Sequence, residues 1–290
     1  MLATENCDTK VLIDSAIAKV GEIATLPEVT VRIIKIVEDP KSTARDLHEV
    51  IKNDPALSTR LLKVVNSAFY GLPGQIASVD RAIVLLGLSA VKNISIAASM
   101  TQLFNAGASV EGFSGVELWR HAIAVGVAAR QIVRVQGKPA VEESFLAGLI
   151  HDLGLLVERQ VYGKQIAEVI ARHEAASTGF WELELEIIGA DHQAFGMALA
   201  NKWRFPMHLC NTIGYHHKPM ELAETNRGLP TLIHLADILA CRCGLGFSQT
   251  AAGTEYRDEI LDLVGIGREA LDEIAAELPE QLAIAEAVFS

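Results

Sequence analysis

The sequence predicts an all-α protein with a two-lobed, multi-helix fold. Apolar residues recur with the 3.6-residue period of helices, strict alternation is almost absent, and only 6% of the residues are aromatic. Of the 290 residues, 50% are apolar, which suffices for the core of one large domain or of two compact ones.

The first hundred residues have the apolar spacing of five or six short helices. Ser42-Thr43 and Asp54-Pro55 are typical helix starts, and Gly87 separates the last two helices of this half. The expected helices cover residues 29–37, 42–52, 54–65, 79–86 and 89–103.

A boundary between two lobes is expected at residues 105–115, which are rich in Gly, Ala and Ser and lack a strong period. The sequence thus divides into an N-terminal lobe, 1–110, and a C-terminal lobe, 111–290. In the second lobe, helices are expected over residues 116–135, 141–159, 163–173, 181–188, 193–203, 207–215, 229–243 and 268–278.

Charge and composition exclude several classes of protein. The net charge of -11 and the pI of about 5.3 disfavour nucleic-acid binding, which needs a basic face. No signal peptide or membrane-spanning stretch is found, so a cytoplasmic protein that does not contact membranes is expected. The four cysteines are too few and too irregular for a disulfide framework, and are expected to be reduced thiols.

The most informative pattern is a series of histidines that recur with aspartates in the second lobe. Its members, in chain order, are His121, His151-Asp152, Asp191-His192, His216-His217 and His234 followed by Asp237. Imidazole and carboxylate ligands from several helices are how helical proteins bind divalent first-row metals. Adjacent side chains on a helix diverge by about 100°, so His151 and Asp152 can both ligate only near a helix end or where helices converge.

Each of these residues also has an ordinary structural explanation. His121 could be a hydrogen-bonded helix residue, His192 could follow an N-cap at Asp191, and His234 could belong to the core. The remaining histidines are interpreted as structural: His48, His173 and His208. The ordered set as a whole favours a metal site.

The order His121, His151-Asp152, Asp237 resembles the H…HD…D pattern of HD-domain phosphohydrolases. The resemblance is sharper to the HDOD family and covers about residues 15–245, which implies an HD-like helical fold. The segments that resemble HDOD proteins are Leu26-Pro27, Asp54–Leu57, Leu61–Ala68, Ala82–Gly87, Gly189–Gly196, Trp203–Pro206, Tyr215–Pro219 and Leu232–Asp237.

The resemblance implies one or two divalent ions, with iron or manganese preferred to zinc, and no organic cofactor. Related HD proteins that degrade cyclic diguanylate can place an extra ligand one turn before the first histidine, where this chain has Glu117. The implied metal ligands are His121, His151, Asp152, His192, His216, His217, Asp237 and, as the extra ligand, Glu117. In an enzyme, Asp152 would be the catalytic residue that bridges two ions.

Two departures argue against hydrolysis of cyclic dinucleotides. The phosphodiesterases of the superfamily carry a lysine three residues after the aspartate of the HD pair, and a Gly-Tyr-Pro element follows it. This chain has Leu155 at that position, and residues 155–160 contain no such element. The loss of the cation removes electrostatic stabilisation of a substrate phosphate.

The leading functional hypothesis is a bacterial signal-transduction protein that acts through contacts with other signalling proteins. The alternative is a metal-dependent phosphohydrolase, with weak or lost activity, acting on a nucleotide or small phosphate ester. Candidate cations for a phosphate ligand are Arg120, Arg159, Lys164 and Lys218, which could equally be solvated surface charges.

Overall fold

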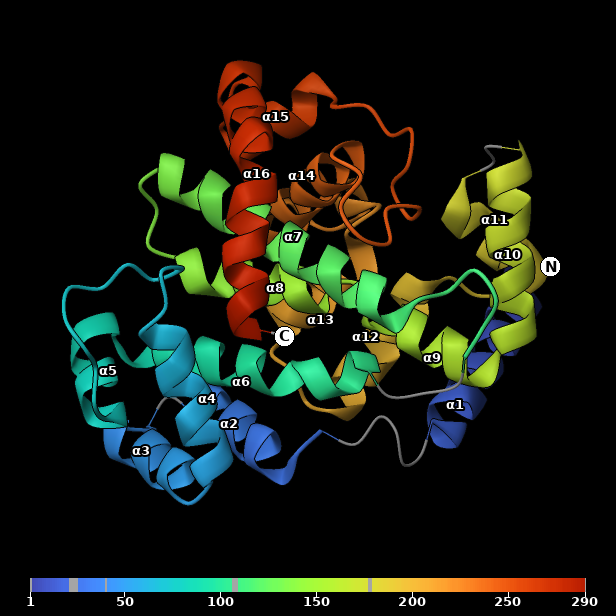
Figure 1. Ribbon diagram of the computed structural model, residues 1–290. Coiled ribbons are helices and arrows are strands. Elements are labelled where there is room, and N and C mark those ends of the chain that lie inside the picture. The colour runs from blue at the N-terminus through green and yellow to red at the C-terminus, as the bar shows by residue number, and fades with distance from the viewer. Residues whose placement is uncertain (1, 21–25, 40, 106–108, 177–178, 290) are drawn as a thin grey trace.

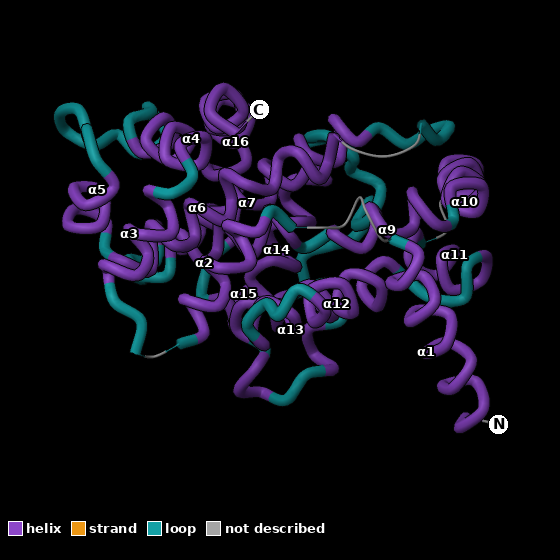
Figure 2. The backbone as a smooth tube through the Cα atoms, turned by 90° about the horizontal axis from the view of Figure 1, so that it is seen from below, coloured by secondary structure: helices purple, strands orange, loops and turns teal. Residues whose placement is uncertain are grey.

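The computed structural model describes residues 2–20, 26–39, 41–105, 109–176 and 179–289. Over these residues the chain is helical without any strand, apart from an isolated bridge between Val110 and Phe113 (Figures 1 and 2). The predicted all-α class is therefore confirmed. Residues 106–108 of the expected lobe boundary lie outside the described residues.

The first half of the chain begins its helices where the sequence predicts. Thr43 caps one helix through a reciprocal pair of hydrogen bonds with Asp46, and Asp54 caps the next, with Pro55 in its first position. Gly87, at a φ of 88°, ends a further helix. The helices of this half are α1 (Leu2–Lys19), α2 (Glu28–Glu38), α3 (Ala44–Lys52), α4 (Pro55–Val65), α5 (Val79–Leu86) and α6 (Leu88–Asn105).

The second half differs from the prediction at one important point. The helix expected over residues 141–159 is wrong as a single element, because α8 ends at Ile150 and α9 begins at Leu153. The elements of this half are α7 (Gly115–Val135), α8 (Val141–Ile150), α9 (Leu153–Val161), α10 (Gly163–Ala176), α11 (Phe180–Ile187), α12 (His192–Lys202), α13 (Met207–Tyr215), η1 (Pro219–Glu221), η2 (Glu224–Asn226), α14 (Gly228–Arg242), α15 (Asp258–Val264) and α16 (Arg268–Phe289).

Two helices connect distant parts of the chain. Helix α1 packs on α9 and α12, apart from α2–α6, and the Lys202 ammonium donates to the Ile17 carbonyl oxygen. Helix α16 runs along α7 and reaches α4 and α6 at its C-terminal end (Figure 1). There the Phe289 carbonyl oxygen accepts hydrogen bonds from Thr101 and from the Trp119 indole.

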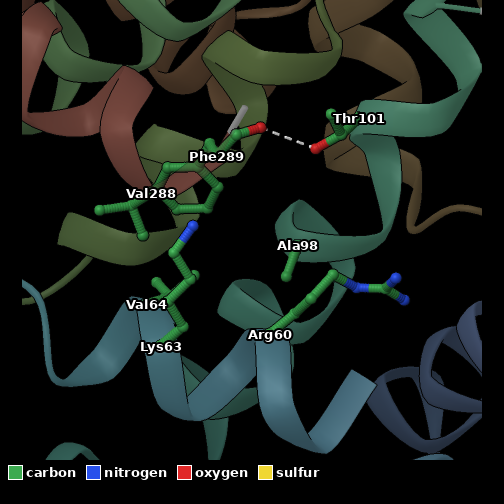
Figure 3. A pocket seen from close by; sticks show the side chains of 7 residues that line it. All are labelled: Arg60, Lys63, Val64, Ala98, Thr101, Val288 and Phe289. Atoms are coloured by element: carbon green, nitrogen blue, oxygen red, sulfur yellow. Dashed lines mark hydrogen bonds between the residues drawn. The ribbon is translucent and has the colours of Figure 1, made fainter. Parts of the chain in front are cut away.

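A small cavity of about 220 Å³ lies where α4, α6 and the end of α16 meet (Figure 3). The Lys63 side chain and the Phe289 ring border it from opposite helices. In the described part of the chain, no helix combines the length and apolar character needed to cross a bilayer.

Candidate metal centre

Seven histidine and aspartate side chains from six different elements converge in the interior of the second half. They form two clusters, in each of which the potential ligand atoms all lie within 4.8 Å of one another. The first cluster contains His121, His151 and Asp237, and the second contains Asp152, His192, His216 and His217. The structure thus brings together every aspartate and histidine of the predicted ligand set.

The break between α8 and α9 lets two neighbouring residues reach the same centre. His151 follows the last residue of α8, and Asp152 occupies the N-cap of α9 with φ -96° and ψ 21°. A continuous helix would direct the two side chains about 100° apart. The interruption is therefore the local feature that allows both to ligate.

Close helix crossings bring the remaining ligands near. A Cβ on Gly148 of α8 would lie 2.5 Å from the Gly126 backbone of α7. A Cβ on Gly154 of α9 would lie 1.7 Å from the His192 carbonyl oxygen at the start of α12. Only glycine permits these approaches, which place the helices carrying His121 and His192 against those flanking His151-Asp152.

Asp152 stands between the two clusters. Its Oδ2 lies 3.2 Å from His151 Nε2, and its Oδ1 lies 3.4 Å from His216 Nε2 and 3.5 Å from His192 Nε2. In the first cluster, Asp237 Oδ1 is 3.1 Å from His121 Nε2. This position of Asp152 fits a carboxylate that bridges two ions.

The outer nitrogens of the rings are fixed by hydrogen bonds to the protein. Each Nδ1 of His121, His151 and His216 faces a backbone carbonyl oxygen, those of Leu245, Gly148 and Ile213 respectively. The Nδ1 of His192 lies 2.7 Å from the Glu184 carboxylate. When Nδ1 donates to these acceptors, the Nε2 lone pair of each ring points into the centre, as in metal-ligating histidines.

Inward-facing lone pairs need a cation between them. The Nε2 atoms of His192 and His216 are 3.3 Å apart, and those of His192 and His217 are 3.1 Å apart. Several buried atoms here have no hydrogen-bond partner within the described chain: His151 Nε2, Asp152 Oδ1, Asp152 Oδ2 and Asp237 Oδ2. A divalent ion at each cluster would satisfy these atoms, so the donor set fits one or two metals.

The electrostatics favour the metal-binding forms in the second cluster, whereas in the first cluster burial is outweighed by the charges of Asp152 and Asp237, which raise the pKa of His151. Burial opposes ionisation, yet the neighbouring His151 and His216 hold the pKa of Asp152 well below its usual range. Burial and the adjacent imidazoles hold the pKa of His217 well below its usual range, and burial also lowers that of His216. The carboxylate is therefore ionised and these two histidines are neutral near pH 7.

The predicted extra ligand does not join the group. Glu117 lies in the first turn of α7 and belongs to neither cluster. His234, for which a core role was considered, is buried, and its Nδ1 faces the His216 carbonyl oxygen at 2.7 Å. It thus supports the backbone of a candidate ligand.

Two glutamates behind His192 were not found from the sequence. Glu184 is fully buried and accepts from the His192 backbone N–H, while Glu158 is fully buried beside Glu184. Glutamates on amphipathic helices ordinarily face solvent. A signal in the sequence is that Glu184 lies one helical turn after Phe180, on the buried face of α11.

An all-helical protein with a buried histidine–aspartate centre of the HD type is the class that this fold and site define. The HDOD domain family matches residues 23–219, more than half of the chain, and the chain belongs to this family. The matched range ends before α14, which carries Asp237.

Solved structures share this fold over nearly the whole chain. An HDOD domain protein of unknown function from Geobacter sulfurreducens superimposes with a TM-score of 0.81 at 22% identity, covering 96% of this chain and 97% of that one. A protein from Shewanella amazonensis SB2B, described as a candidate phosphohydrolase, gives 0.71 at 25% identity, with 95% and 98% coverage.

A longer relative shows the same similarity in sequence. An uncharacterized protein of Treponema pallidum (strain Nichols) is 25% identical over 221 residues, which is 76% of this chain. The chain spans only 42% of the length of that relative.

Proposed function

We propose that this chain is a cytoplasmic signal-transduction protein whose metal centre holds its helices together and whose surface contacts other signalling proteins. The burial of the centre carries this proposal. Six of its seven residues are at most 1% exposed, and the side chain of the seventh, His217, is 5% exposed. Structural metal sites are closed, whereas catalytic ones keep a position open for substrate.

The surroundings of the centre also favour a regulatory role. Leu155, at the position where cyclic-dinucleotide phosphodiesterases carry lysine, is fully buried. Lys218, next to the partly buried His217, lies 3.3 Å from Asp191 Oδ2 and 3.8 Å from the Trp181 ring centre. A cation held by a carboxylate and an aromatic face is not free to bind a substrate phosphate. Cys241 and Cys243 are not joined in a disulfide, which fits a reducing cytoplasm.

A metal-dependent phosphohydrolase acting on a nucleotide or small phosphate ester is the second candidate. The completeness of the two ligand clusters favours it, since two neighbouring ions can activate and bind a phosphate ester. The similarity to the Shewanella protein supports the same class. In such an enzyme, Asp152 would hold both ions.

Metal removal tests the centre itself, and turnover assays separate the two candidates. We expect purified protein to contain iron or manganese, and chelation to lower its melting temperature, since an ion at a hundredfold excess over its Kd stabilises by about 2.7 kcal/mol. Turnover on cyclic dinucleotides, nucleoside phosphates and small phosphate esters should stay well below about 1 per second. A rate at or above that value would establish the hydrolase instead. Protein that binds no ion and gains no stability from one would refute the metal centre itself.

A further inference from the structure

Arg159 of α9 is a buried cation without a counter-ion. The residue is 6% exposed, and its one hydrogen bond within the described chain runs from Nη1 to the Phe104 carbonyl oxygen at 3.3 Å. Its Nε has no partner, and no carboxylate of the described residues lies within 4.0 Å. The guanidinium otherwise faces the Phe113 ring, 5.6 Å from its centre.

This arrangement is costly in a protein with many acidic side chains. An uncompensated buried charge destabilises a fold, and the net charge of -11 means that acidic side chains outnumber basic ones. By contrast, the other deeply buried arginine, Arg130, pairs with Glu142. Burial lowers the pKa of Arg159 and no neighbouring charge opposes this effect. We therefore expect that an anion from outside the chain compensates the charge of Arg159.

The guanidinium lies directly beneath the first turn of α7. A Cβ on Gly115, the first residue of that helix, would fall 2.4 Å from Arg159 Nη1 and 2.3 Å from the Phe104 carbonyl oxygen. The first amides of a helix have no partner within it, and its dipole places partial positive charge there. Arg159 is thus repelled by the end of α7, and both groups would attract the same anion.

The start of α7 beside Arg159 is open to solvent. Ser114 is exposed, Gly115 is half-buried and Val116 is 64% exposed, so the helix begins at the surface. The capping hydroxyl of Ser114 accepts from Glu117 N–H, which leaves the amides of the two intervening residues for a ligand.

We propose that the start of α7 and the Arg159 side chain form a binding site for the phosphoryl group of a small molecule, separate from the metal centre. Arginine and helix amides present several N–H donors that match the oxygens of a tetrahedral oxyanion. Helix α7 carries His121 of the first cluster, and helix α9 begins directly after Asp152 of the second. The bound anion would therefore contact the elements that position both clusters.

The test uses inorganic phosphate, a nucleoside monophosphate and the unphosphorylated nucleoside as probes with the full chain. Calorimetry and thermal shifts should show binding of one or both phosphorylated probes, and the nucleoside should give no signal. Arg159→Gln should weaken binding at least about tenfold, and its melting temperature without ligand should be equal or higher. Gly115→Ala, which keeps the charge but obstructs the helix start, should also lose binding. Arg172→Gln, an exposed arginine paired with Glu186, is the control.

Three outcomes would overturn the site. One is the absence of binding of both phosphorylated probes to wild-type protein at millimolar concentration. Another is unchanged affinity in Arg159→Gln, which would place the anion elsewhere. The third is loss of binding in Asp152→Ala but not in Arg159→Gln, which would assign the phosphate to the metal centre. If inorganic phosphate and the monophosphate bind with similar affinity, free phosphate is a sufficient ligand. If only the monophosphate binds, the ligand is a nucleotide.

Discussion

At the scale of single residues, four of the five histidines of the centre direct one ring nitrogen to a protein acceptor and the other into the centre. Backbone carbonyls hold Nδ1 of His121, His151 and His216, whereas a carboxylate holds that of His192. These contacts fix the tautomer and the ring orientation before an ion arrives. Asp152 is the residue on which both clusters depend, because its two oxygens face different histidines.

Replacing that shared carboxylate should therefore uncouple both positions. We expect Asp152→Ala to lose most of the bound metal, measured by elemental analysis of protein purified without added metal. His173→Ala should lose none, because His173 packs against Phe180 and belongs to neither cluster. Equal metal content in the two variants would contradict the assigned role of Asp152.

Glu158 and Glu184 lead to a second prediction at the scale of residues, which concerns the pH dependence of the free energy of unfolding. Burial, together with the charge of Glu184, raises the pKa of Glu158 well above its usual range. Two buried carboxyl groups in contact are acceptable when one is protonated and donates to the other. Between the ordinary and the raised pKa the folded state binds the extra proton, so the free energy of unfolding falls as pH rises through this window.

Glu158→Gln should reduce this pH dependence, because the amide donates to Glu184 without titrating. We expect urea unfolding from about pH 5 to about pH 8 to show a shallower loss of stability than wild type, by up to about 1.4 kcal/mol per pH unit. The matched control is Glu186→Gln on the same helix, where the side chain is exposed and pairs with Arg172. An identical pH profile in wild type and Glu158→Gln would show that the pair holds no proton.

At the scale of elements, the centre depends on helices that approach more closely than ordinary side chains allow. A Cβ at position 154 would meet the His192 carbonyl oxygen at 1.7 Å and Gly196 N at 2.8 Å. Gly154→Ala should therefore separate α9 from α12, lower the free energy of unfolding by about 1–3 kcal/mol and weaken metal binding. At Gly267 an added Cβ would have no neighbouring atom within 4 Å, so Gly267→Ala should change neither the free energy of unfolding nor the metal affinity. If Gly154→Ala left the metal affinity unchanged, the geometry of the ligands would not depend on the distance between α9 and α12.

The elements also show what the sequence could and could not predict. Caps at Thr43 and Asp54 and strong apolar faces made α3 and α4 predictable. Helix α1 was not expected, since its apolar residues do not concentrate on one face of the helix. The break at His151-Asp152 leaves no signal in the apolar period, because residues on both sides of it are buried. The ligands were found because their residue types and order are unusual, whereas Glu158 and Glu184 depend on tertiary contacts alone.

At the scale of the whole molecule, aromatic and charged side chains tie the two halves together. The Arg130 guanidinium of α7 stacks 3.8 Å from the Phe69 ring centre and donates to the Phe69 carbonyl oxygen. Phe289, at the end of α16, packs against Phe69 and against Phe145 of α8. Phe69 follows α4, so these contacts join the predicted N-terminal lobe to the helices that carry the centre.

The final prediction concerns the segment between the two expected lobes. Exposed connections with small and polar residues are the usual sites of proteolytic nicking, and Glu111, Gly112 and Ser114 are exposed. We expect limited proteolysis to cut within residues 105–115 before it cuts either lobe.

The two fragments should nevertheless co-elute on size exclusion and keep their metal, because α16 reaches α4 and α6 while α6 packs on α8. Arg130→Met, which removes the charged contacts to Phe69 and Glu142, should allow the nicked fragments to separate at lower denaturant concentration. Resistance of residues 105–115 under conditions that digest other connections would mean that the two halves share one continuous core. Immediate separation of the nicked wild-type fragments would instead mean that the covalent connection, and not the Phe69–Arg130–Phe289 contacts, holds the lobes together.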